Sequence, residues 1–115
     1  MFKRVLRLFR RGADGPAWVE ANELRRRLRR GDMNLIIDVR GPDEFDGPLG
    51  HIPGALNVPL ASIAGRGPTL ANAGLPIVLV CLTDKRSSQA AAELAAAGVR
   101  DVAVLKGGMK AWRGE

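Results

Sequence analysis

The chemistry available to this chain centres on its only cysteine, Cys81, and on the residues that follow it. The stretch VCLTDKRSSQAAAELAAAG, residues 80–98, places that cysteine after an apolar run and before the cationic pair Lys85 and Arg86. The thiolate is the reactive form of cysteine, and nearby positive charge stabilises it. The spacing therefore predicts a nucleophilic sulfur beside an anion-binding loop. The alternative is an inert, buried cysteine at the end of a strand.

The sequence around Cys81 predicts a strand, a short loop and a helix. Residues 77–81, IVLVC, are apolar and β-branched, which is typical of a buried strand. Residues 87–97 are rich in alanine and predict a helix that stops at Gly98, so residues 82–86 form the loop. In open α/β sheets, ligands bind at such strand ends, where loop N–H groups and a helix N-terminus attract anions. These features favour the thiolate form of the cysteine.

Three further stretches predict helix or loop. Trp18 and later apolar residues recur at spacings of three and four, which predicts a helix over residues 18–30 that stops at Gly31. Residues 65–76 carry three Gly and two Pro and indicate mainly a loop. GGMKAW, residues 107–112, predicts a glycine turn that opens a last short helix.

The alternation of predicted strands and helices indicates the fold class. Short apolar runs at residues 35–39, 55–58 and 102–105 are expected to be strands. The first of them is apolar throughout, as in a strand buried on both faces of a parallel sheet. We therefore expect an α/β fold with a mainly parallel central sheet, flanked by helices on both faces.

Positive charge is concentrated in the first quarter of the chain. Residues 1–31 hold 10 Lys/Arg and 3 Asp/Glu, a net charge of +7, whereas residues 32–115 hold 8 and 9, a net charge of −1. We divide the chain into a basic amphipathic extension with its linker, residues 1–16, and one domain, residues 17–115. The extension is expected to rest on the domain or fray, with weak membrane-surface or partner contact through residues 1–11 as the alternative. Nucleic-acid binding is not predicted, because the domain itself is close to neutral.

The number of cysteines indicates the redox environment of the protein. One cysteine cannot form an internal disulfide, which fits a reducing, cytoplasmic environment. No apolar run approaches the roughly eighteen residues of a membrane-spanning helix. One histidine and one cysteine provide no metal cluster, and no cofactor is implied.

Four motifs, taken in order, resemble those of the single-domain rhodaneses, a family of sulfurtransferases. They are LIIDVRGPDEF, GHIPGALNVPL, IVLVCLTDKRSSQAA and VLKGGMKAW, and the resemblance covers roughly residues 17–115. It implies a rhodanese-like fold and makes Cys81 the sulfur acceptor that becomes a persulfide. It also implies that backbone N–H groups of the loop bind the substrate, with the site residues Leu82, Thr83, Asp84, Lys85, Arg86 and Ser87.

The resemblance assigns further detail to this loop. Arg86 matches the arginine that closes the loop, and Lys85 lies where the family often holds an anionic donor. Four residues separate Cys81 from Arg86, as in the sulfur-transferring members; the related phosphatases have a loop one residue longer. Asp84 replaces the more usual glycine. Asp tolerates a left-handed backbone, so the loop can form, but its carboxylate opposes the cations and leaves the donor's identity open.

The other matches are expected to be structural. By the resemblance, Asp38, Arg40 and Glu44 form ion pairs and hydrogen bonds near the site. His51, the only histidine, is expected to make structural hydrogen bonds in its loop, with a Cys–His pair as the alternative. Turn and packing roles are expected for Gly107, Gly108 and Trp112.

The function implied is sulfur transfer in two half-reactions. A sulfane sulfur would pass from thiosulfate or a persulfide donor to Cys81, and then to a thiophilic acceptor such as cyanide, a small thiol or a protein cysteine. Two alternatives remain. One is a rhodanese-fold binding module without catalysis, and the other is a sulfur carrier docked to a membrane or partner through the basic extension.

Overall fold

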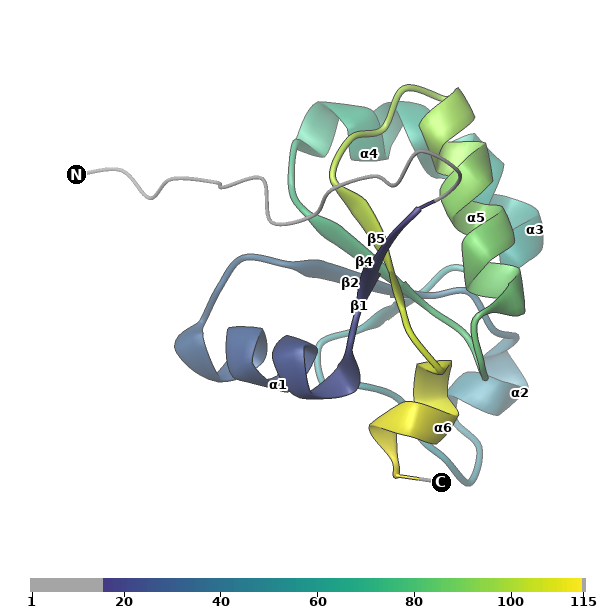
Figure 1. The fold of residues 1–115 in the computed structure, drawn as a ribbon. Coiled ribbons are helices and arrows are strands. Elements are labelled where there is room, and N and C mark those ends of the chain that lie inside the picture. The colour runs from purple at the N-terminus through teal and green to yellow at the C-terminus, as the bar shows by residue number, and fades with distance from the viewer. Residues whose placement is uncertain (1–15, 115) are drawn as a thin grey trace.

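A computed structural model describes residues 16–114, and a parallel sheet forms its centre (Figure 1). The five strands lie in the order β1-β5-β4-β2-β3, and every neighbouring pair is parallel. The strands are β1 (Ala17–Val19), β2 (Leu35–Asp38), β3 (Leu56–Asn57), β4 (Ile77–Val80) and β5 (Val102–Leu105). The predicted fold class is confirmed, and each segment predicted as a strand contains one.

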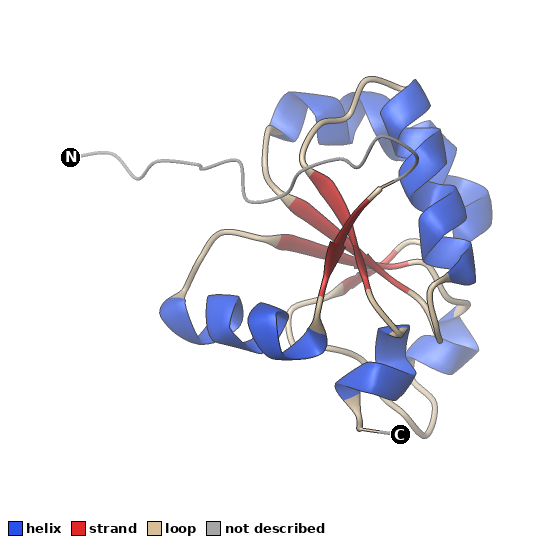
Figure 2. Ribbon diagram, in the orientation of Figure 1, coloured by secondary structure: helices blue, strands red, loops and turns tan. Residues whose placement is uncertain are grey.

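Helices cover both faces of the sheet (Figure 2). They are α1 (Ala21–Arg30), α2 (Pro42–Phe45), α3 (Leu60–Ile63), the 3-10 turn η1 (Ala64–Arg66), α4 (Gly67–Ala73), α5 (Lys85–Ala96) and α6 (Gly108–Trp112). On one face, α3 and α5 contribute Ile63 and Leu94 to an apolar cluster. On the other face, α1 and α6 contribute Leu24 and Met109 to a second cluster. This arrangement is the usual one for a parallel sheet, which needs both faces covered.

The central strand β4 decides on which face the cysteine lies. Successive side chains of a strand point to opposite faces. Ile77, Leu79 and Cys81 accordingly belong to the cluster on the α5 side, whereas Val78 and Val80 belong to the cluster on the α6 side. Cys81 follows directly on β4 and therefore lies on the face that α5 covers.

The helix predicted over residues 18–30 begins later than expected. α1 starts at Ala21, and Trp18 lies in the edge strand β1, where it is 50 % exposed. Its neighbours Ala17 and Val19 are buried and pair with β5. The spacing of Trp18 from the apolar residues of α1 is thus coincidental, and pairing with a distant strand determines its conformation.

The prediction of a loop over residues 65–76 is also wrong, because η1 and α4 occupy most of this segment. Proline lies in the first turn of α4, a position where its missing N–H costs no hydrogen bond. Gly67 packs closely against α5, since a Cβ there would lie 2.7 Å from the Cβ of Ala97. The glycine and proline that suggested a loop serve helix initiation and close helix packing instead.

The helix after Cys81 starts at Lys85, two residues earlier than predicted. Both long helices stop at the predicted glycines, Gly31 with φ 75° and Gly98 with φ 86°. The amphipathic helix considered for residues 1–11 lies outside the described residues. Between residues 16 and 114, no helix combines the length and apolar character needed to cross a membrane.

The start of α6 lies against the loop that follows Cys81. Gly107 and Gly108 both have positive φ, 76° and 57°. A Cβ on Gly108 would overlap the carbonyl oxygens of Thr83 and Cys81. Glycine is therefore required here both for the backbone conformation and for the close approach of two chain segments.

We predict that Gly108→Ala destabilises the fold more than a matched alanine substitution at Gly74. Gly74 has a similar φ of 66°, but a Cβ there meets nothing within 4 Å. Left-handed backbone alone costs an alanine about 1–2 kcal/mol, and overlap with packed backbone adds about 1–3 kcal/mol at Gly108. Urea unfolding of both variants measures the difference. Equal losses of unfolding free energy would contradict the close-approach argument.

Candidate active site

The sulfur of Cys81 lies buried under the first turn of α5. The residue is 1 % exposed. Its Sγ accepts a hydrogen bond from the backbone N–H of Ser87 at 3.4 Å and lies 3.3 Å from the Ser87 hydroxyl oxygen. The first-turn N–H groups of a helix have no carbonyl partner within the helix, so they are natural donors to an anion. Ser87 therefore brings one of these donors, and a hydroxyl, to the sulfur.

The loop after Cys81 is bound to α6 by two backbone hydrogen bonds. The N–H of Met109 donates to the carbonyl of Cys81 at 2.8 Å, and the N–H of Lys110 donates to the carbonyl of Leu82 at 3.1 Å. In a planar trans peptide, the carbonyl and the following N–H point in opposite directions. Binding these two carbonyls to α6 consequently turns the N–H groups of Leu82 and Thr83 away from α6.

The loop's own N–H groups are left available as donors. Within residues 16–114, no protein acceptor engages the backbone N–H of Leu82, Thr83 or Asp84. Unpaired donors of this kind gathered in one loop form an anion-binding site. The backbone cradle expected for these residues is therefore consistent with the geometry, while the binding of a substrate there stays a prediction.

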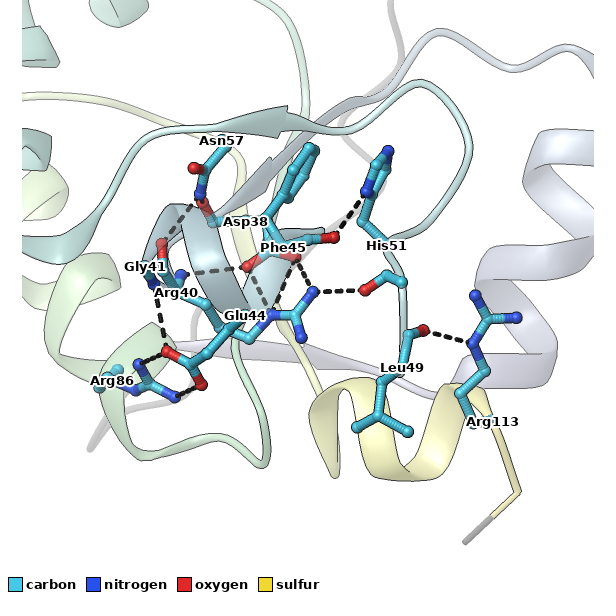
Figure 3. Close-up of polar contacts among 11 residues, drawn as sticks. Asp38, Arg40, Gly41, Glu44, Phe45, Leu49, His51, Asn57, Arg86 and Arg113 are labelled. Atoms are coloured by element: carbon cyan, nitrogen blue, oxygen red, sulfur yellow. Dashed lines mark hydrogen bonds and ion pairs between the residues drawn. The ribbon is translucent and has the colours of Figure 1, made fainter. Parts of the chain in front are cut away.

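An ion pair ties the first turn of α5 to α2 (Figure 3). Both terminal nitrogens of Arg86 donate to the carboxylate of Glu44, at 2.7 and 2.9 Å. These hydrogen bonds from Arg86, aided by one from the N–H of Gly41, lower the pKa of Glu44 from its ordinary value of 4.5 to about 2. The same pairing with Glu44 raises the pKa of Arg86. The Arg86 side chain, which was expected to close the loop, is thus bound to Glu44.

A second ion pair, between Arg40 and Asp38, is fully buried. The Arg40 guanidinium donates three hydrogen bonds to the Asp38 carboxylate, at 2.9, 3.1 and 2.8 Å, and one to the carbonyl of Gly50 at 2.7 Å. The amide of Asn57 donates to the backbone carbonyls of Asp38 and Arg40, at 3.1 and 2.8 Å (Figure 3). The structural ion pairs expected of Asp38, Arg40 and Glu44 are confirmed. The bracing by Asn57 was not predicted, because nothing near it in sequence marks its partners.

His51 is engaged away from the sulfur. Its Nδ1–H donates to the carbonyl of Phe45 at 2.8 Å, and its ring stacks on the Phe45 ring with centroids 3.6 Å apart (Figure 3). The structural role expected for His51 is confirmed, and the geometry gives no support to a Cys–His pair.

Asp84 and Lys85 are the two charged loop residues that form no ion pair in the described part of the chain. Asp84 has φ −149°, so the left-handed backbone expected there does not occur. Its carboxylate accepts the N–H of Gly107 at 3.4 Å, a contact that sequence reasoning missed because 23 residues separate the partners. Lys85 is exposed, and no carboxylate in the described part of the chain pairs with it.

In residues 16–114, no three His, Cys, Asp or Glu side chains gather as a metal site would require.

The Arg86–Glu44 pair generates a pH prediction. We expect Glu44→Gln to lower the free energy of unfolding by about 0.5–1 kcal/mol at pH 7, a modest value because both side chains are more than a third exposed. The folded pKa of Glu44 is depressed, so its stabilisation is present above pH 4.5 and lost as pH falls toward 2. Urea unfolding at pH 7 and pH 3 should therefore show a difference from the parent protein that shrinks at pH 3.

Glu93→Gln is the matched control for this test. Glu93 lies on α5 and accepts a hydrogen bond from neutral Gln89 rather than from a cation. A pH-dependent loss of the same size in both variants would show that the effect is one of net charge and not of the ion pair.

Comparison with known proteins agrees with this arrangement. The family model described as "Rhodanese-like domain" matches residues 20–115. The uncharacterized protein YqhL of Bacillus subtilis is 41 % identical over 80 residues, which are 70 % of this chain and 61 % of that protein. Thiosulfate sulfurtransferase GlpE of Pseudomonas putida is 35 % identical over 88 residues, covering 75 % of this chain and 76 % of that enzyme.

A solved structure gives the same result. The rhodanese-like domain of a protein from Anabaena superposes with a TM-score of 0.75 and 32 % identity, over 84 % of this chain and 73 % of that one. The family predicted from the four motifs is confirmed. This chain belongs to the rhodanese-like family, which includes sulfurtransferases.

Proposed function

We propose that this protein transfers a sulfane sulfur from thiosulfate or a persulfide donor to a thiol acceptor through a persulfide on Cys81. The observation that carries the proposal is the setting of the Cys81 sulfur, which accepts a first-turn N–H of α5 at 3.4 Å. Three further loop N–H groups, of residues 82–84, have no acceptor in the described part of the chain. A site of this kind is suited to a sulfur anion and to one additional sulfur atom.

In the first half-reaction, the Cys81 thiolate attacks the outer sulfur of the donor. With thiosulfate, the new bond joins Sγ to the outer sulfur, and the original S–S bond breaks. Its electron pair leaves with sulfite, so a thiolate and a dianion become a persulfide anion and sulfite. Preorganised N–H donors stabilise charge without having to reorganise during the reaction, and here they would act on the persulfide anion.

In the second half-reaction, the acceptor takes the outer sulfur. An acceptor thiolate attacks that sulfur and forms a new S–S bond, while the Sγ–S bond breaks and returns the thiolate of Cys81. Dividing one transfer into two displacements predicts ping-pong kinetics. The proposal places the protein in the reducing cytoplasm, where acceptor thiols stay reduced.

The loop residues have separate roles in this proposal. Ser87 directs its N–H and hydroxyl at the sulfur. Arg86 holds the loop to α2 through Glu44, so it positions the loop. The four residues between Cys81 and Arg86 match the length of the sulfur-transferring loops that the sequence resembles and disfavour a phosphatase.

Intact-protein mass spectrometry tests the proposal. After incubation with thiosulfate, the parent protein should gain one sulfur atom and lose it again to cyanide, with thiocyanate released. Cys81→Ser should gain none, because it lacks the nucleophile. Ser88→Ala is the matched control: this neighbouring serine of α5 is not bonded to the sulfur, so the variant should still load sulfur. No loading of the parent protein by thiosulfate or by any persulfide donor would overturn the proposal in favour of a binding module.

Docking to a membrane or protein partner through the basic extension is a separate proposal. It rests on the basic character of the extension, whose residues 1–16 hold 5 Lys/Arg and 1 Asp. Deleting residues 1–12 should abolish sedimentation with anionic phospholipid vesicles and leave sulfur loading from thiosulfate unchanged. Vesicle binding that survives the deletion would contradict it.

A further inference from the structure

The charges around the loop compensate one another. Both terminal nitrogens of Arg86 are bound by Glu44, so they are not free to bind a ligand directly, and the carboxylate offsets much of the guanidinium charge. Arg40 is likewise paired with Asp38, and both side chains are buried. That leaves the exposed Lys85 as the cation of the loop itself, and the carboxylate of Asp84 is its immediate neighbour.

The Asp84 carboxylate contacts the turn before α6 through one long hydrogen bond. Its Oδ2 accepts the N–H of Gly107, the turn residue that precedes α6. α6 in turn binds the carbonyls of Cys81 and Leu82. The negative charge therefore lies in a loop that α6 contacts at several points, three residues from Cys81 in sequence.

We propose that Asp84 is a specificity-determining residue, which makes this loop favour monoanionic sulfane-sulfur donors over dianionic donors such as thiosulfate. The inference rests on the proposed function. Its physical basis is that the repulsion between a carboxylate and a donor scales with the charge of the donor. One negative charge at position 84 therefore opposes a dianion twice as strongly as a monoanion.

Methanethiosulfonate is the matched monoanionic probe. Its outer sulfur is bonded to a sulfonyl sulfur, as in thiosulfate, but a methyl group replaces one anionic oxygen. The Cys81 thiolate attacks the outer sulfur, the S–S bond breaks, and its electron pair leaves with methanesulfinate. Both donors thus leave the same persulfide anion on Cys81, and they differ in charge by one unit.

The deciding experiment compares Asp84→Asn with the parent protein on both donors, at low ionic strength. Asparagine keeps a side-chain oxygen that can accept the Gly107 N–H, so the loop is retained. We expect kcat/KM for methanethiosulfonate to rise roughly two- to three-fold, and that for thiosulfate by the square of this factor, roughly four- to nine-fold. Both gains should shrink as added salt screens the charge.

Two further variants control the interpretation. Glu93→Gln makes the same change in net charge elsewhere on α5 and should leave the ratio of the two donors unchanged. Lys85→Gln should lower kcat/KM for thiosulfate more than for methanethiosulfonate. Equal changes for the two donors in Asp84→Asn, or no change, would overturn the inference. If neither donor loads the parent protein with sulfur, the proposed function itself fails, and mass spectrometry distinguishes that outcome.

Discussion

The binding of the Cys81 and Leu82 carbonyls by the first N–H groups of α6 is the interaction on which the site depends. These hydrogen bonds, at 2.8 and 3.1 Å, fix the direction of the loop peptides and so turn their N–H groups away from α6. The approach is close enough that only glycine fits at position 108. The five-residue helix α6, on one face of the sheet, therefore determines the conformation of the loop after Cys81, which leads into α5 on the other face.

Two ion pairs brace this arrangement at different depths. The Asp38–Arg40 pair is buried at the end of β2, where its attraction is largely offset by the loss of hydration. Its contribution is positional: through the carbonyl of Gly50 and the amide of Asn57 it joins three chain segments. The Arg86–Glu44 pair is half-exposed and connects the first turn of α5 to α2, so the loop is held at both ends.

The charge distribution at the site follows from these two ion pairs. Each arginine that braces the structure is paired with a carboxylate, which offsets much of its charge. In the proposed sulfur transfer, selection between donors of different charge is left to the neighbouring pair Asp84 and Lys85, of which the carboxylate is bound to Gly107 and the ammonium is exposed. The backbone N–H groups would bind the anionic donor, and these two side chains would bias the site by the charge of that donor.

Features whose physical cause is local follow from the amino-acid sequence alone. Apolar β-branched runs became strands, glycines ended α1 and α5, and the order strand, loop, helix placed Cys81 between the end of β4 and the N-terminus of α5. Trp18 and residues 65–76 were interpreted wrongly, because pairing with β5 and packing of Gly67 on Ala97 determine them. The groups that surround the loop after Cys81 could not be inferred in this way, because α6 and Glu44 lie far from Cys81 in sequence and reach the loop through the fold. Hydrogen bonds between distant segments depend on how the strands and helices are assembled, and local residue patterns carry no record of that.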